Sequence, residues 1–141
     1  MFSHTTEIRV RYGETDKMGY VYYGNYMLYY EVGRVEAIRS LGMTYKSLED
    51  TGIIMPVTHL NSKFIRPALY DDLLTLVTTI KERPEKQIIF NVEIFKQGGI
   101  LINIGEVKLC FINTLTGTKI SAPPIMLKKL RPYFEADHKT I

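Results

Sequence analysis

The feature that most constrains the fold is a helical segment that is apolar around most of its circumference. It spans residues 26–41, with Asn25 suited to cap its start and Gly42 suited to the position just past its end. Only four charged side chains interrupt its apolar surface, and they form one narrow stripe: Glu31, Arg34, Glu36 and Arg39. Such a helix must be covered on most sides. Gly33 in its middle indicates that another backbone approaches closely there.

The segments on either side of this helix predict an antiparallel sheet that can provide the cover. Apolar and polar residues alternate with the period of two that half-buried strands show, and short turns separate the last three runs. The predicted strands cover residues 7–12, 53–68 with a break near Pro56, 73–83, 87–96 and 100–113, and short helices cover residues 44–50 and 125–130. The predicted fold class is therefore α+β, with an antiparallel sheet curled around one long central helix.

The length of 141 residues fits a single domain, which we place at residues 1–134, followed by a polar tail at residues 135–141. A net charge of +3 and a hydrophobic content of 45% argue against disorder, and the scattered basic residues do not indicate nucleic-acid binding. The longest run without a charged residue, residues 18–30, is shorter than the roughly 18 apolar residues of a membrane-spanning helix. No signal-peptide core precedes Ile8, so the sequence predicts a cytoplasmic protein.

The sequence lacks the motifs of several kinds of catalytic and cofactor sites. Cys110 is the single cysteine, which excludes an internal disulfide and a cysteine-rich zinc site. His4, His59 and His138 are too far apart in the sequence to show metal-ligand spacing. Phosphate-binding glycine loops and the GxSxG nucleophile motif are also missing. We therefore expect no metal site and no site of those kinds.

The loop before the long helix carries the most informative residues. Glu14 and Asp16 lie in a glycine-bearing segment, residues 12–26, that leads into the helix start. A helix start offers unpaired N–H groups and a partial positive charge, which would polarise an acyl carbonyl as an oxyanion hole does. Asp16 could then attack the carbonyl carbon or activate a water molecule. From spacing alone, the simpler interpretation is that either carboxylate caps a turn.

Two stretches of the sequence together form a family pattern. The first reads Y-x-E-T-D-x-M-G-x-V-Y-x-x-N-Y followed by E-x-x-R-x-E, and its matching residues are Tyr12, Glu14, Thr15, Asp16, Met18, Gly19, Val21, Tyr22, Asn25, Tyr26, Glu31, Arg34 and Glu36. The second is Phe-Ile-Arg-Pro-Ala at residues 64–68, followed by Asp71-Asp72-Leu73. These stretches resemble the 4-hydroxybenzoyl-CoA thioesterase family, in particular its bacterial branch of acyl-CoA thioesterases linked to the Tol–Pal system. The resemblance covers about residues 5–130, nearly the whole chain.

This resemblance implies a hotdog fold and the hydrolysis of acyl-CoA thioesters without a metal or an organic cofactor. It implies that Asp16 is the nucleophile or the general base, and that the backbone amide at Tyr23 donates a hydrogen bond to the thioester oxygen. It also implies homodimers paired through their sheets, or homotetramers, with active sites between protomers. The sequence departs from the branch at residue 23, where Tyr replaces the common His and is a far weaker base near neutral pH.

Other residues are further candidates for the site. Glu31 on the helix is a second catalytic candidate, although an ion pair with Arg34, three residues later, is the simpler interpretation. Tyr22 and Asn25 fall within the matched pattern and are candidates for contact with the substrate. The candidates for binding the CoA phosphates are Lys63, Arg66 and Lys128.

The alternative function is that of a hotdog protein that binds acyl-CoA or an acyl-carrier protein without hydrolysis. Three properties stay open in the sequence. They are the length or aromatic character of the acyl group, the choice between CoA and an acyl-carrier protein as its handle, and the number of subunits beyond a dimer. Each depends on how the chain packs in three dimensions, which a linear pattern does not describe.

Overall fold

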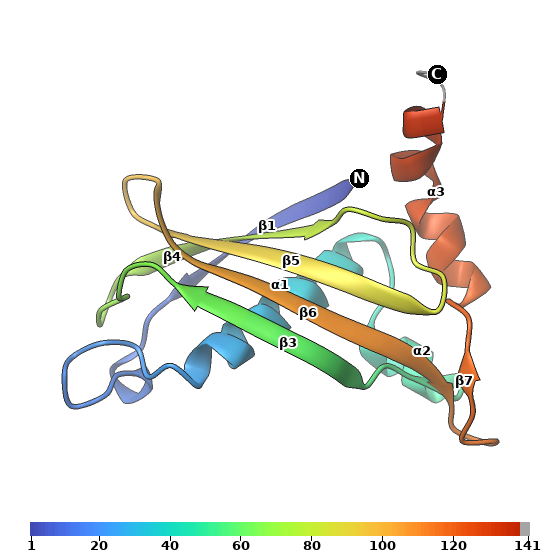
Figure 1. Ribbon diagram of the computed structural model, residues 1–141, viewed down its shortest axis with the longest axis horizontal. Helices are drawn as coiled ribbons and strands as arrows, with labels where there is room; N and C mark the ends of the chain where they lie inside the picture. Colours follow the sequence, from blue (N-terminus) through green and yellow to red (C-terminus); the bar gives the residue numbers. More distant parts are fainter. Residues whose placement is uncertain (139–141) are drawn as a thin grey trace.

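The computed structural model describes the backbone of residues 1–138 and the side chains of residues 1–135. Its elements in chain order are β1 (Phe2–Arg9), the 3-10 turn η1 (Tyr12–Glu14), α1 (Asn25–Ser40), α2 (Tyr45–Asp50), β2 (Ile53–Ile54), β3 (Val57–Phe64), β4 (Leu73–Ile80), β5 (Gln87–Lys96), β6 (Ile100–Asn113), β7 (Lys119–Ile120) and α3 (Pro124–His138). All strand pairs are antiparallel, in the order β1-β4-β5-β6-β3, with β2 and β7 paired to the far end of β6. Figure 1 shows α1 lying along one face of the curved sheet, so the predicted architecture is confirmed.

The long helix packs against the inward-facing side chains of the central strands. Along β4 and β5 every second side chain is buried, which is the alternation of a sheet with one covered face. The buried set includes Leu74, Leu76 and Ile80 of β4, Ile88, Phe90, Val92 and Ile94 of β5, and Tyr29, Tyr30, Ala37 and Ile38 of α1. Burial of one such apolar side chain contributes roughly 1.5–3 kcal/mol. This packing fixes the position of α1 on the sheet.

Two contacts let α1 approach the sheet closely. A Cβ atom built on Gly33 would lie 2.6 Å from the Thr78 Oγ1 atom of β4, so the close neighbour at this glycine is a side chain rather than the predicted backbone. The hydroxyl of the buried Tyr30 reaches between strands, where it hydrogen-bonds with Ser62 of β3 and Asn103 of β6. The first half of α1 is therefore held on the sheet by polar as well as apolar contacts.

The N-terminal strand lies earlier in the chain than predicted. The sequence predicted a strand at residues 7–12, whereas β1 pairs with β4 over Phe2–Arg9. Residues 3–6 are all polar, so they show no apolar alternation that the sequence could reveal, and pairing with β4 selects the strand. The chain then leaves the sheet for the turn η1, where Tyr12 is 78% exposed.

The C-terminal helix is longer than predicted. The sequence predicted a short helix at residues 125–130, whereas α3 spans Pro124–His138. Met126, Leu130 and Phe134 are four residues apart, so they share one face of the helix, and all three are buried. Residues 139–141, the end of the predicted tail, lie outside the described residues. No helix in the described part of the chain is both long enough and apolar enough to cross a bilayer.

One side of α1 is uncovered within a single chain. Leu28 and Val32 are 56% and 39% exposed, although most residues of α1 are buried or half-buried, as predicted. The sheet also has an open edge, because β3 pairs only with β6 among the described residues. The helix carries more apolar surface than this one sheet covers.

Candidate functional site

Asp16 sits in a tight turn that uses only one of its two carboxylate oxygens. Its Oδ1 atom accepts hydrogen bonds from the backbone N–H groups of Met18 (2.9 Å) and Tyr20 (3.2 Å). The Asp16 N–H in turn donates to the Tyr20 carbonyl at 2.7 Å, and Gly19, at φ +84°, closes the turn. The turn-capping role predicted from spacing is therefore confirmed. The Oδ2 atom has no hydrogen-bond partner among the described residues and stays available for chemistry.

Glu14 fastens this turn to the beginning of α1. Its Oε1 atom accepts from the Arg11 N–H (2.8 Å) and from the Tyr29 hydroxyl (3.0 Å), and its backbone carbonyl accepts from the Tyr22 N–H (2.9 Å). The same carbonyl accepts from the Asn25 side-chain amide at 2.8 Å, while Gly24 takes the helix-capping position predicted for Asn25. Sequence reasoning missed the contact between Glu14 and Tyr29, which are 15 residues apart.

The phenol of Tyr29 acts as a donor to this carboxylate. Burial and the neighbouring Glu14 carboxylate raise the pKa of Tyr29 well above its ordinary value. The phenol therefore stays protonated at neutral pH and donates a hydrogen bond to the Glu14 Oε1 atom. The arrangement holds the Asp16 turn at a set distance from the first turns of the helix.

The two sequence motifs meet beside Asp16. The Val21 N–H donates to the Ala68 carbonyl at 2.8 Å, and Tyr20 forms a β-bridge with Leu69. These contacts bring residues 64–68 against the Asp16 loop and enclose a cleft of about 280 Å³. Its lining includes Asp16, Tyr20, Tyr23, Tyr26, Phe64 and Arg66. Met18, Val21, Ile65 and Pro67 complete the lining, so the cleft is largely apolar, with one carboxylate and one guanidinium.

The start of α1 has two backbone amides without an acceptor in the described part of the chain, and one of them belongs to Tyr23, which lines this cleft. The Tyr22 N–H is used by the Glu14 carbonyl, and the Asn25 N–H donates to the Tyr22 carbonyl at 2.9 Å. The N–H groups of Tyr23 and Gly24, between them, have no acceptor among the described residues. A free amide at a helix start carries the positive end of the helix dipole. The site thus combines a carboxylate with a hydrogen-bond donor for a polarised oxygen.

The structure gathers some of the predicted site residues and separates others. Asp16, Tyr23 and Arg66 line one cleft. Lys63 is exposed and precedes Phe64 on β3, and because neighbouring strand residues face opposite sides, its side chain points away from the cleft that Phe64 lines. Lys128 lies on α3, which Figure 1 shows at the opposite end of the sheet from the Asp16 loop.

Tyr22 and Asn25 flank the cleft rather than line it. The ring of Tyr22 is 47% exposed and packs against the ring of Tyr23, with 4.6 Å between the ring centroids. The side-chain amide of Asn25 is already engaged by Glu14. In the isolated chain both residues shape the helix start, on which the free amides depend.

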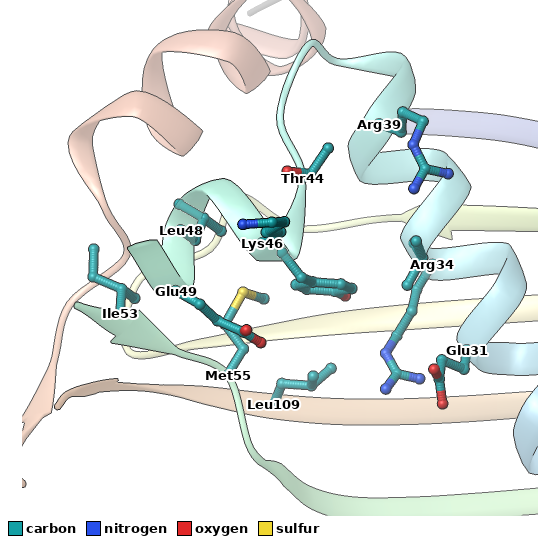
Figure 2. Close-up of a pocket in the computed structure, with 12 residues that line it drawn as sticks. Glu31, Arg34, Arg39, Thr44, Lys46, Leu48, Glu49, Ile53, Met55 and Leu109 are labelled. Atoms are coloured by element: carbon teal, nitrogen blue, oxygen red, sulfur yellow. The ribbon is translucent and has the colours of Figure 1, made fainter. Parts of the chain in front are cut away.

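Glu31 lies in a different pocket. This pocket, of about 410 Å³, is formed between α1 and α2, and Figure 2 shows Glu31 beside Arg34 within it. The ion pair predicted between Glu31 and Arg34 is wrong, because no such contact forms among the described residues. The guanidinium of Arg34 lies instead over the ring of Tyr45, 6.0 Å from its centroid.

The described residues contain no group of three or more His, Cys, Asp and Glu side chains placed to hold a metal ion. Cys110 is a buried residue of β6 and does not line the Asp16 cleft. The residues lining the cleft that can take part in chemistry are therefore Asp16, the tyrosines (Tyr23 with its free N–H included) and Arg66.

Comparisons with known proteins identify the family of the chain. The Thioesterase superfamily matches residues 18–103, which is more than half of the sequence. The crystal structure of DHNA-CoA thioesterase from Staphylococcus aureus is similar at 34% identity and a TM-score of 0.82, over 99% of this chain and 88% of that chain. Acyl-CoA thioester hydrolase YbgC of Escherichia coli is 28% identical over 77% of this chain and 81% of its own length. The 4-hydroxybenzoyl-CoA thioesterase of a Pseudomonas species is 29% identical over 62% of this chain and 64% of its own length. The chain therefore belongs to the thioesterase superfamily and has its hotdog fold.

Proposed function

We propose that this protein is a cytoplasmic thioesterase that hydrolyses an acyl-CoA to a free acid and CoA. One observation carries the proposal: a single cleft is lined both by Asp16, with one carboxylate oxygen unused, and by Tyr23, whose N–H has no acceptor among the described residues. Membership of the thioesterase superfamily supports it, as do relatives that are named acyl-CoA thioester hydrolase and 4-hydroxybenzoyl-CoA thioesterase.

In the proposed reaction the thioester oxygen accepts a hydrogen bond from the Tyr23 N–H. The bond strengthens as negative charge grows on that oxygen, so it stabilises the transition state more than the substrate. One donor of this kind contributes about 3–4 kcal/mol to lowering the barrier. Because the donor is a backbone amide, Tyr at position 23 in place of His leaves this part of the mechanism intact.

Asp16 fits two roles that differ in the bond it makes. As a nucleophile, its Oδ2 atom attacks the acyl carbon, the C–S bond breaks, and water then hydrolyses the mixed anhydride. As a general base, Oδ2 removes a proton from water while that water attacks, and the proton passes to the leaving thiolate. Both routes consume one water molecule and return the carboxylate. Rapid quenching followed by mass spectrometry separates them, since only the first leaves an acyl group on the peptide that contains Asp16.

The dimensions and lining of the cleft favour a small acyl group. Its volume is about 280 Å³ and its walls include Tyr20, Tyr26 and Phe64, which suits a single aromatic ring or a short aliphatic chain. Two of the related proteins are named for aromatic acyl groups or DHNA-CoA. Arg66 supplies a positive charge for the CoA phosphates. Lys63 and Lys128 lie outside this cleft and are not part of the proposed CoA site.

The proposed active form is a homodimer or a homotetramer. The open edge at β3 and the exposed Leu28 and Val32 of α1 are the kind of surface that a second copy covers. Size-exclusion chromatography with light scattering tests this, because the chain alone has a mass of 16.3 kDa. A species of that mass at micromolar concentration would contradict the oligomer.

Release of free thiol from a panel of acyl-CoAs tests the proposed hydrolysis. The panel contains benzoyl, butyryl and palmitoyl thioesters, and we expect turnover of the first or second to exceed that of the third. Folded protein that binds these thioesters but releases no thiol would contradict hydrolysis and support the alternative, an acyl-binding protein. Turnover restricted to acyl-carrier-protein thioesters would support hydrolysis, with an acyl-carrier protein in place of CoA as the carrier of the acyl group.

A further inference from the structure

One wall of the Asp16 cleft lies on the seam between α1 and the strands β3 and β6. We propose that two successive side-chain contacts across this seam limit the length of the acyl group, first Tyr26 with Phe64 and then Tyr30 with Ser62. The substrate of the site is therefore a short-chain or single-ring acyl thioester. This assignment rests on the function proposed above, because that function supplies the acyl-CoA.

The residues of the two contacts follow one another along α1 and along β3. Tyr26 and Tyr30 are four residues apart, so they lie on the same face of the helix, one turn from each other. Phe64 and Ser62 are two residues apart, so they face the same side of the sheet. Tyr26 contacts Phe64, and Tyr30 contacts Ser62. The two contacts therefore fill successive positions along the seam, one behind the other.

The first contact is an aromatic pair at which the cleft ends. The rings of Tyr26 and Phe64 meet edge to face, with 5.2 Å between their centroids and 83° between their planes. Both residues line the cleft, whereas Tyr30 and Ser62 do not. An acyl chain that enters from the Asp16 side therefore meets this pair before it can reach the second contact.

The two rings of the first contact differ in how firmly they are held. Tyr26 is 3% exposed, and its ring also packs edge to face on the ring of Tyr29, with 5.7 Å between the centroids. Phe64 is 52% exposed and lies on the open edge strand. A smaller side chain at Phe64 should therefore lengthen the cleft without disturbing the core.

The second contact is held by hydrogen bonds that an acyl chain would have to break. The Tyr30 hydroxyl hydrogen-bonds with Ser62 and donates to the Asn103 side chain, whose amide donates to Ser62 Oγ at 3.2 Å. Gly105 makes room for the Tyr30 ring, because a Cβ atom there would overlap it. Tyr30 and Asn103 are fully buried, so water does not replace these bonds when the ring is displaced. The second contact thus stops a chain that has passed the first.

The values of kcat/KM for butyryl-, octanoyl- and dodecanoyl-CoA in thiol-release assays test the first contact. We expect the unmodified protein to prefer butyryl-CoA. In Phe64→Ala the octanoyl-to-butyryl ratio should rise about tenfold or more, which is the discrimination that a single methylene can bring in an apolar pocket. Dodecanoyl-CoA should remain a poor substrate of this variant, because Tyr30 still closes the seam.

Val57→Ala is the matched control for Phe64→Ala. Val57 is another apolar residue of β3, is 46% exposed and does not line the cleft. Its truncation should leave the length ratios within about twofold of the unmodified protein.

The double variant Phe64→Ala with Tyr30→Leu tests the second contact. The next positions along the seam are apolar, since Leu60 of β3 lies opposite Val107 of β6 and both pack in the core. Opening both contacts should therefore raise the dodecanoyl-to-butyryl ratio about tenfold above that of Phe64→Ala. Tyr30→Leu alone should leave the ratios within about twofold, because the first contact still closes the cleft. If the Tyr30 variants do not fold, dodecanoyl-CoA with Phe64→Ala alone decides the second contact.

Affinity measurements separate this assignment from the proposed hydrolysis. Isothermal titration of the same thioesters into Asp16→Asn, with and without Phe64→Ala, should show the same dependence on chain length. A protein that releases no thiol would contradict the hydrolysis, and the affinities would still decide the role of the two contacts.

Three results would overturn the assignment. The first is a preference of the unmodified protein for dodecanoyl-CoA, in turnover or in affinity. The second is a change of the length ratios in Phe64→Ala that does not exceed the change in Val57→Ala. The third is a Phe64→Ala protein that accepts dodecanoyl-CoA as readily as octanoyl-CoA, because Tyr30 would then not stop the chain.

Discussion

Tyr29 and Tyr45 are two inward-facing tyrosines, and only the Tyr29 hydroxyl has a hydrogen-bond partner among the described residues. This contrast gives a quantitative test of the site. The Tyr29 hydroxyl donates to the Glu14 carboxylate at 3.0 Å, whereas the Tyr45 hydroxyl is buried without a partner among the described residues. Tyr29 is only 2% exposed and the Glu14 side chain 14%, so water does not replace a lost bond fully. A hydrogen bond to a charged acceptor contributes about 1.5–3 kcal/mol. Because Arg11 keeps donating to Glu14, we expect Tyr29→Phe to cost about 2 kcal/mol, near the lower end of that range.

The same substitution at Tyr45 should have no cost, since it removes a hydroxyl that is buried and unsatisfied. For a domain of this size, about 2 kcal/mol lowers Tm by roughly 7 °C in Tyr29→Phe, against no decrease in Tyr45→Phe. Calorimetry measures both. Since Glu14 and Tyr29 hold the Asp16 turn against α1, kcat of Tyr29→Phe should also fall about tenfold with KM less affected. Equal losses of stability in the two variants, or an unchanged Tm and kcat in Tyr29→Phe, would refute the reasoning.

Three further predictions follow from neighbouring features. Gly33→Ala places a Cβ 2.6 Å from Thr78 Oγ1 and should cost about 1–3 kcal/mol in urea unfolding; full stability would contradict the close approach. Arg66→Met should raise KM for the acyl-CoA about tenfold in thiol-release assays, whereas Lys63→Met, on the opposite face, should leave KM unchanged; equal effects would contradict the assigned faces. The pKa of Tyr45 is raised to about 12 from an ordinary 10.0, so the unfolded chain releases this proton at a lower pH than the folded protein, and stability falls as pH rises from 10 through 12. Tyr45→Phe should therefore lose less stability than the unmodified protein in this window, and identical losses would contradict the assignment.

Much of the fold follows from local patterns. β5 and β6 have the predicted boundaries, because alternation and the glycine turn at residues 97–99 are local signals. The early start of β1 and the length of α3 depend on partners far away in the sequence. β1 is selected by pairing with β4, and the last turns of α3 by burial of Phe134. Propensity alone does not contain these long-range contacts.

The motif residues of the site could be predicted from the sequence, but the contacts that hold them in place could not. The pattern around Asp16 and Tyr23 is contiguous, and the cleft contains both. The contacts of Glu14 with Tyr29, and of residues 64–68 with the Asp16 loop, join segments that only the fold brings together. The predicted ion pair of Glu31 with Arg34 failed for a related reason. Helical spacing permits the pair, but the ring of Tyr45 on α2 lies in reach of the same guanidinium.

The measurement that tests the central claim most directly is thiol release by Asp16→Asn beside the unmodified protein. Asn keeps an Oδ1 acceptor for the N–H groups of Met18 and Tyr20, so the turn should persist and Tm should change by no more than about 2 °C. The substitution removes the free carboxylate oxygen, and we expect kcat to fall about a thousandfold. Folded Asp16→Asn protein that turns over acyl-CoA at the unmodified rate would contradict the catalytic role of Asp16 and direct attention to Glu31.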